Sequence, residues 1–410
     1  MKKIFNFGLY DFANSAFTTI IITFIFATYF ATQIAPNPVL GQSYWGWTIG
    51  LTGFLVAIIG PISGFLADKK NKIVFFIRFF SLLCIFFTSL LWFSKPSSSF
   101  LLYTLIIVAI ANFFYELSMV FYNALLKDVA TKKNLGKSSG FGFALGYVGG
   151  IIILLLSIKL FIDNNNLPFG LTKEESQNIR AIALLVSFWF LIFSIPFLFF
   201  SINEQKKIKK KFSFNFSEIK KLVWDKKIST LGKFLIARML YADGLNAIIV
   251  MGGIFAVGVF NLEIKDLLKL SVLMNITAFI GAFLGGIAND KYGSKIVIIL
   301  SLIGLIFSSI AILFIYSKVG FFFLAAINGL FIGPIQSASR VVITKLLKKN
   351  DQGKGFGLFA TSGKLTSFLG PLLVSTVTFL TDSQRLGFSA AIILLLAGLG
   401  ILLRIKKSIN

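Results

Sequence analysis

Long apolar runs follow one another from end to end of this 410-residue chain. Short breaks that contain charged residues, glycine, proline or asparagine separate them. The hydrocarbon core of a bilayer is about 30 Å thick, so a run of about 20 apolar residues forms a helix that can cross it. The runs are continuously apolar instead of alternating, which argues against the strands of a membrane barrel. The pattern therefore predicts an all-α integral membrane protein.

Twelve such runs can be counted, and composition agrees with this class. Hydrophobic residues make up 56% of the chain and charged residues 14%, whereas a soluble protein carries about a quarter charged residues. We expect twelve transmembrane helices at 5–33, 45–67, 73–94, 100–126, 138–161, 181–202, 231–260, 267–288, 295–316, 320–346, 355–380 and 386–404.

Several kinds of chemistry are excluded by residues that the chain lacks. It has no histidine and one cysteine, Cys84, so it cannot form a Ser-His-Asp triad, a Cys-rich zinc site or an intramolecular disulfide. Gly136-Lys137-Ser138 resembles the end of a phosphate-binding loop, but Thr131 stands where that motif requires its first glycine. We expect no enzyme activity, no cofactor and no metal.

The lysines and arginines that give the chain its net charge of +24 are unevenly distributed along it. Only eight of the 40 fall in loops after odd-numbered helices, and most of the others lie at the termini and in the even-numbered loops. Basic residues collect on the cytoplasmic side, so both termini are expected in the cytoplasm. The positive charge then serves topology and attraction to lipid, not nucleic-acid binding. We expect a multi-pass protein of the cell membrane, the inner one in a Gram-negative organism.

The longest break, 203–230, interleaves basic and aromatic residues as an interfacial segment does. It divides the chain into an N-terminal six-helix half at 1–202, a basic cytoplasmic linker at 203–230, and a C-terminal six-helix half at 231–410. Glycines four positions apart, such as Gly281 and Gly285, predict close helix packing.

Three repeated motifs support this division. The pair Asp11 and Asn14 recurs as Asp243 and Asn246, with the same spacing. The loop GFLADKK has a counterpart in GIANDKYG, and GKSSGFGFALG has one in GKGFGLFATSG. The repeats predict two pseudo-symmetric halves that enclose a central cavity, a common transporter plan.

Polar and charged residues inside apolar helices are expensive, so they are candidates for function. Asp11, Asn14, Ser15 and Thr18 form a polar stripe on the helix at 5–33. The residues expected to line the cavity are Asp11, Asn14, Glu116, Asn123, Asp243, Asn246, Gln336, Arg340 and Lys364.

These residues have different expected roles. Glu116 is a candidate proton carrier, because a low-dielectric surrounding favours a neutral carboxyl; the alternative is a fixed ion pair with Arg340 or Lys364. Those two cations are candidate sites for a substrate carboxylate, and Asp243 or Glu116 for a substrate ammonium group. Sugars or organic anions would also find partners here. Pro334 predicts a kink in its helix.

The loop that begins at Gly64 resembles the G-x-L-A-D-R/K signature of the major facilitator superfamily, and the loop at Gly286 resembles its second copy. The segments YDFANSAF, FYNALL and QSASR resemble the vacuole-effluxer-like branch, which contains fungal vacuolar amino-acid exporters and bacterial relatives. Two positions depart from the pattern: Lys127 replaces a proline and Asn71 replaces a glycine. The resemblance implies a secondary transporter, with amino acids as the favoured substrates.

The resemblance also implies a gating role for the two loops. Asp68 and Asp290 would hold the outward-open state through contacts that break in the other state; the alternative is a plain cap on the next helix. The gating residues implied are Gly64, Asp68, Lys69, Gly286, Asp290, Lys291 and Gly293.

We therefore expect a secondary transporter that moves a small polar solute by alternating access, as an exporter driven by a substrate or proton gradient. One alternative is a passive facilitator of the same fold for organic anions or sugars. Another is a non-transporting membrane receptor or scaffold. The expected partners are a small-molecule substrate, the lipid bilayer and protons, and we expect a monomer.

Overall fold

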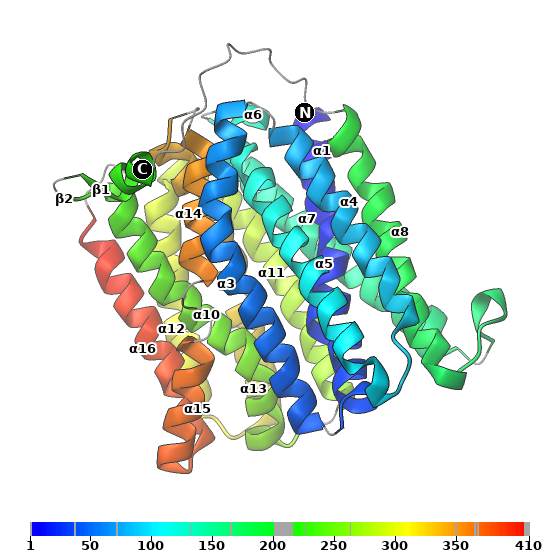
Figure 1. Cartoon of the computed structure of the whole chain (residues 1–410). Helices are drawn as coiled ribbons and strands as arrows, with labels where there is room; N and C mark the ends of the chain where they lie inside the picture. Colours follow the sequence, from blue (N-terminus) through cyan, green and yellow to red (C-terminus); the bar gives the residue numbers. More distant parts are fainter. Residues whose placement is uncertain are drawn as a thin grey trace. The chain divides into compact units, whose positions relative to one another are not determined.

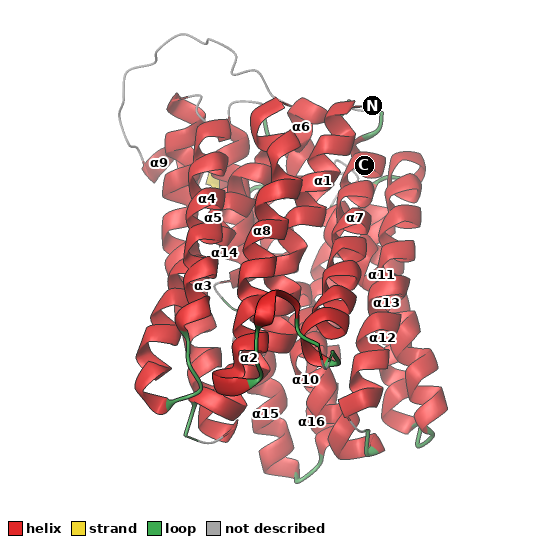
Figure 2. Cartoon of the chain, turned by 90° about the vertical axis from the view of Figure 1, so that its right-hand side faces the viewer, coloured by secondary structure: helices red, strands yellow, loops and turns green. Residues whose placement is uncertain are grey.

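A computed structural model describes residues 2–36, 38–70, 73–131, 133–164, 166–200, 216–225, 227–262, 264–348, 351–364, 366 and 369–405. Long helices joined by short loops dominate these residues (Figures 1 and 2). A helix satisfies its own backbone hydrogen bonds, which is what apolar runs of this length require in lipid.

The bounds of the elements follow the apolar runs. Up to residue 200 they are α1 Lys2–Ala16, η1 Phe17–Phe24, α2 Ile25–Tyr29, η2 Phe30–Ile34, α3 Pro38–Lys70, α4 Ile73–Leu90, η3 Leu91–Phe93, η4 Ser98–Phe100, α5 Leu101–Ala124, α6 Leu126–Val129, α7 Leu135–Ser157, η5 Ile158–Ile162, η6 Pro168–Gly170, η7 Glu174–Ser176 and α8 Gln177–Phe200. Beyond it they are α9 Phe216–Val223, β1 Trp224–Asp225, β2 Lys227–Ile228, α10 Thr230–Phe260, α11 Ile264–Tyr292, α12 Ser294–Phe314, α13 Lys318–Leu346, α14 Gln352–Lys364, α15 Leu369–Thr381 and α16 Gln384–Leu403.

The predicted membrane helices are confirmed, with one difference. Within the described residues, 11 helical segments are long and apolar enough to cross a bilayer. The helix predicted at 355–380 is instead two shorter ones, because α14 ends at Lys364 and α15 begins at Leu369. Pro371 lies in the first turn of α15, where the missing N–H of proline costs no intrahelical bond.

The chain forms two compact units, which are described separately. Unit 1 comprises Met1–Val56, Asn71–Tyr122 and Leu145–Lys207, and unit 2 comprises Ala57–Lys70, Asn123–Ala144 and Ile208–Asn410. The division into halves at 1–202 and 231–410, joined by a linker at 203–230, stays a prediction.

In unit 1, α8 packs against both α1 and α4. Aromatic rings fill the contact: Phe7 stacks on Tyr122 with ring centroids 4.2 Å apart, and Tyr10 and Phe197 lie against the same ring. All four side chains are buried. Because α5 carries Tyr122, these rings fix the position of α5 relative to α1.

In unit 2, α11 packs along α13 and α10 along α16. The predicted glycine packing is confirmed, since a Cβ added to Gly285 would lie 2.6 Å from the Cβ of Pro334, and one added to Gly333 would lie 2.6 Å from the carbonyl oxygen of Ala278. Gly281 faces the carbonyl oxygen of Leu330 so closely that no side chain fits between them. Small residues thus bring these two helices into near-backbone contact.

The predicted linker contains structure in its described part. The helix α9 packs against the start of α10, and β1 and β2 form a two-stranded antiparallel hairpin that pairs Trp224 with Ile228. Ser229 joins this region to α10, because its hydroxyl donates to the carbonyl of Leu222 at 2.6 Å and accepts from the amide of Gly232 at 3.0 Å.

Candidate functional site

The polar stripe on the first helix is buried in unit 1 against α5. The Tyr122 hydroxyl lies 2.8 Å from Oδ2 of Asp11 and 2.8 Å from the carbonyl oxygen of Phe7. Asp11 is 6% exposed. A carboxylate that accepts a hydrogen bond from tyrosine is partly stabilised in a setting where an isolated charge would be costly.

Asn14 lies one turn further along α1, on the same side as Asp11. Its amide nitrogen donates to the carbonyl of Tyr10 at 2.8 Å, and the hydroxyl of Tyr115 on α5 lies 3.5 Å from its amide oxygen. Glu116, the next residue on α5, is half-buried. The structure therefore brings Asp11 and Asn14 of the predicted set together with tyrosines of α5.

Arg340 is the centre of a buried polar cluster in unit 2. It lies on α13 and is 1% exposed. Its Nη1 donates to the Asn123 amide oxygen at 3.1 Å, its Nε to the Ser139 hydroxyl at 2.9 Å, and its Nη2 to the Ser139 carbonyl at 2.7 Å. The guanidinium also lies over the Phe143 ring, 4.5 Å from its centroid. The fork of Arg340 thus binds protein groups of α5 and α7. That Arg340 binds a substrate carboxylate stays a prediction.

The second loop signature contacts α7 directly. The Asp290 carboxylate, near the end of α11, accepts hydrogen bonds from the backbone amides of Gly136 at 2.6 Å and Lys137 at 2.9 Å. These amides belong to the first turn of α7, where backbone N–H groups have no intrahelical acceptor and the helix dipole favours a negative charge. Asp290 is therefore an acidic cap that ties α11 to α7.

Glycines allow this contact. A Cβ on Gly286 would lie 2.8 Å from the carbonyl oxygen of Gly136 and 3.0 Å from the Cα of Gly140.

A lysine adds another contact in unit 2. The Lys127 ammonium donates to the carbonyl of Leu347 at 2.7 Å, just past the end of α13. We call the contacts of Arg340, Asp290, Gly286 and Lys127 with their partners the closure cluster. All of its residues belong to unit 2.

The remaining gating residues have varied surroundings. Gly64 is buried in α3, whereas the side chains of Asp68 and Lys69 lie outside the described residues. Lys291 is exposed, and its ammonium lies 5.0 Å from the centroid of the Tyr292 ring. Gly293 has a φ of 90° and precedes α12, a conformation that a glycine adopts without strain.

Asp243 lies on α10 and is 2% exposed. Its Oδ1 is buried and has no hydrogen-bond partner in the part of the chain that the structure describes. Asn246 and Gln336 are half-buried, and the side chain of Lys364 lies outside the described residues. Whether the nine predicted residues line one cavity stays a prediction.

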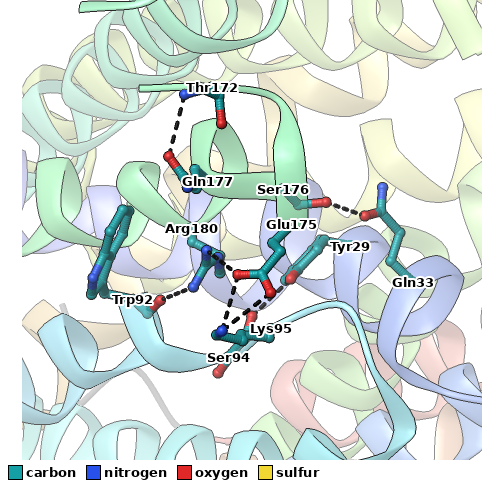
Figure 3. Close-up of polar contacts among 10 residues, drawn as sticks. All are labelled: Tyr29, Gln33, Trp92, Ser94, Lys95, Thr172, Glu175, Ser176, Gln177 and Arg180. Atoms are coloured by element: carbon teal, nitrogen blue, oxygen red, sulfur yellow. Dashed lines mark hydrogen bonds and ion pairs between the residues drawn. The ribbon is translucent and has the colours of Figure 1, made fainter. Parts of the chain in front are cut away.

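A further polar cluster in unit 1 joins the ends of helices and the loops beside them (Figure 3). The Glu175 carboxylate lies 3.0 Å from the ammonium of Lys95 and 3.7 Å from Nη2 of Arg180. Arg180 donates to the carbonyl of Trp92 at 3.0 Å, and its guanidinium lies 5.0 Å from the centroid of the Trp92 ring. The Tyr29 hydroxyl donates to the carbonyl of Ser94 at 2.7 Å. These contacts bind the ends of several helices together, a structural role.

Sequence reasoning missed several partners of the predicted residues. Tyr115 and Tyr122 directly precede the predicted positions Glu116 and Asn123 on α5, and Ser139 and Phe143 lie in the motif GKSSGFGF. A serine and a tyrosine inside apolar runs are weak signals by themselves, because both also occur as ordinary packing residues. Among the described residues, no group of three Cys, Asp or Glu side chains is arranged to hold a metal ion.

Comparisons with known proteins agree with this architecture. The family described as "Vacuole effluxer Atg22 like" matches residues 127–408. The uncharacterized MFS-type transporter YxiO of Bacillus subtilis is 28% identical over 410 residues, covering 98% of this chain and 94% of that protein. Autophagy-related protein 22 of Yarrowia lipolytica is 25% identical over 300 residues, which cover 65% of this chain and 50% of that protein. The crystal structure of the human organic anion transporter MFSD10 superposes with a TM-score of 0.74 at 15% identity, covering 98% of this chain and 99% of that one.

Proposed function

The chain belongs to the vacuole effluxer Atg22-like family of major-facilitator-type membrane transporters, and from this premise we propose that it exports amino acids by alternating access. It is a transporter and not an enzyme. We further propose that a substrate or proton gradient drives the export. In this proposal the protein lies in the cell membrane with both termini in the cytoplasm.

The closure cluster is the observation that carries alternating access. Arg340 and Asp290, from the predicted C-terminal half, bind Asn123, Ser139 and the first turn of α7, which belong to the predicted N-terminal half. These contacts are hydrogen bonds between polar groups, so breaking them exposes groups that water can satisfy. A state that has this cluster and a state that lacks it can therefore differ little in free energy, as a transport cycle requires.

Amino acids are the favoured substrates for two reasons. The family resemblance points to vacuolar exporters, and the name of the matched family describes an effluxer. A zwitterion also needs groups of both signs, and the membrane-spanning helices carry acidic side chains at Asp11, Glu116 and Asp243 and a cation at Arg238. The proposed lining residues are Asp11, Asn14, Glu116, Asp243, Asn246, Gln336 and Lys364.

Flux into liposomes tests the proposal. The purified full chain is reconstituted, and uptake of a mixed pool of labelled amino acids is measured with and without an inward proton gradient. Asp243→Asn is the test variant and should reduce uptake; Phe307→Leu is its matched control, because Phe307 on α12 is 71% exposed. Empty liposomes give the background.

Selective and saturable uptake by the wild type and by Phe307→Leu supports the proposal. An uptake rate that is the same with and without the proton gradient identifies a passive facilitator. If folded protein produces no flux, amino acids are rejected, and the same vesicles are tested with organic anions and sugars. A chain that transports none of these, yet binds them, would favour a receptor.

A further inference from the structure

A basic surface lies immediately before α10, the first membrane-spanning helix of the predicted C-terminal half. Lys220 and Lys221 are in the last turn of α9 and Lys227 is in β2, and all three side chains are exposed. Trp224 in β1, which lies between them in sequence, is 52% exposed. We call Lys220, Lys221, Trp224 and Lys227 the basic hairpin surface.

Backbone contacts fix this surface to the start of α10. The Ser229 amide donates to the carbonyl of Val223 at 2.9 Å, and the Ser229 hydroxyl donates to the carbonyl of Leu222 at 2.6 Å. A Cβ on Gly232 would lie 2.5 Å from the same Val223 oxygen, so the end of α9 packs on the first turn of α10 with no room for a side chain. The helix α9 and the hairpin therefore keep a set position relative to α10.

That position is at the surface of a bilayer. The membrane-spanning stretch of α10 begins at Thr230, and β2 ends at Ile228. The strand β2 packs against α10, and Figure 1 shows β1 and β2 at the end of α10 where that helix begins, extending outward from it. A bilayer that α10 crosses therefore brings its lipid headgroups to the level of the hairpin.

The lysines of this surface form no ion pair among the described residues. The acidic residues of α9 and the hairpin are Glu218 and Asp225, whose side chains lie outside the described residues. By sequence, residues 203–230 contain nine lysines and three acidic residues. The stretch therefore keeps a net positive charge even with every carboxylate ionised.

The phosphate groups of anionic lipids complement this charge. Lysines beside the end of a membrane helix are attracted to a negatively charged leaflet, and the indole of tryptophan, an apolar ring with one N–H donor, concentrates at the boundary between headgroups and acyl chains. We propose that the basic hairpin surface binds anionic phospholipid headgroups in the leaflet at the start of α10, with Trp224 seated among them. This binding is independent of any transported substrate, so it is tested without a flux measurement.

Tryptophan fluorescence of the full chain in lipid nanodiscs tests the proposal. The emission of Trp224 is obtained as the difference between the wild type and Trp224→Phe. It is compared in nanodiscs of phosphatidylcholine alone and in nanodiscs of three parts phosphatidylcholine to one part phosphatidylglycerol. We expect the anionic lipid to shift this emission to shorter wavelength and to reduce its quenching by acrylamide. Concentrated sodium chloride should reverse both changes, because salt screens exposed charges.

Two double variants, each measured with its Trp224→Phe counterpart, assign the response to this surface. Lys220→Gln with Lys221→Gln should abolish the response of Trp224 to phosphatidylglycerol. Lys133→Gln with Lys137→Gln is the matched control, because it removes the same charge from two exposed lysines near the start of α7, and it should leave the response unchanged.

Three results would overturn the proposal, whatever the flux measurements show. The first is a Trp224 emission that is the same in neutral and anionic nanodiscs. The second is a response that the control variant abolishes as fully as the test variant does. The third is the same response when glycerol phosphate is dissolved around nanodiscs of phosphatidylcholine alone, because the surface would then bind a free phosphate and not a lipid.

Discussion

Arg340 illustrates how a buried charge is accommodated in this protein. It is 1% exposed, and such a side chain is tolerated only where its donors find acceptors. Ser139 supplies both a hydroxyl and a carbonyl to the same guanidinium, which is the two-point geometry that arginine fits and lysine does not.

We expect Arg340→Met to lower the free energy of unfolding by about 1–3 kcal/mol, because the acceptors on Ser139 and Asn123 stay buried without a donor. Arg340→Lys should lose nearly as much, since an ammonium group cannot reach both oxygens of Ser139 and the amide of Asn123. Chemical denaturation of the purified protein measures both. If Arg340→Lys is as stable as the wild type, the fork geometry is unimportant.

The two cations that pair with Glu175 in Figure 3, Arg180 and Lys95, differ in burial. Arg180 has a 5% exposed side chain and binds a backbone carbonyl, whereas Lys95 has a side chain that is 46% exposed. We expect Arg180→Met to cost about 1–3 kcal/mol of unfolding free energy, and Lys95→Met less than about 1 kcal/mol. Thermal unfolding of the two variants side by side checks the order, and equal losses would contradict it.

The sequence identified Arg340 as a functional candidate but not its partners. An arginine inside an apolar run is visible because it is expensive there. Asn123 and Ser139 lie about 200 positions away in sequence, and helical periodicity carries no information on contacts between distant helices. The prediction of a substrate site at Arg340 rested on its charge and its guanidinium fork, and it stays a prediction; the structure adds the neighbours that hold the side chain.

Among the helices, the contact of α7 with α11 depends on glycine. Gly286→Ala would place its Cβ 2.8 Å from the Gly136 carbonyl oxygen, so the two helices must separate. We expect a loss of about 1–3 kcal/mol in unfolding free energy and faster alkylation of a cysteine introduced at Ser138, which is 1% exposed.

Gly252→Ala is the matched control for this experiment, because nothing lies within 4 Å of a Cβ at Gly252. It should leave the alkylation rate at Ser138→Cys unchanged. The same slow rate in Gly286→Ala would mean that α7 and α11 accommodate the methyl group without separating.

Most helices were predictable because a long apolar run has one stable form in lipid. The break between α14 and α15 was not predictable. Residues 355–380 contain one charged residue, Lys364, and otherwise apolar residues, glycine, serine, threonine and one proline, which a continuous membrane helix also accepts. Only Pro371, in the first turn of α15, indicates where a helix begins. Helix breaks of this kind are set by neighbouring helices, which the local sequence does not describe.

For the whole molecule, the distribution of lysine and arginine predicts orientation. Phe169, in a loop predicted to be outside, is 95% exposed, and Lys137, predicted to be cytoplasmic, is exposed. The natural Cys84 is buried and gives a low background for labelling. We expect a membrane-impermeant maleimide to label Phe169→Cys in intact cells and Lys137→Cys only after lysis. The reverse pattern would invert the topology.

Pro334 removes one backbone hydrogen bond from the middle of α13. Proline has no backbone N–H, so the carbonyl of Leu330, four residues earlier, lacks the donor that a regular helix would supply. That carbonyl faces Gly281 of α11 instead. Bending α13 at this joint therefore has one amide hydrogen bond fewer to strain than bending a regular helix has. The joint lies between the turns of α13 that pack on α11 and the segment that bears Arg340.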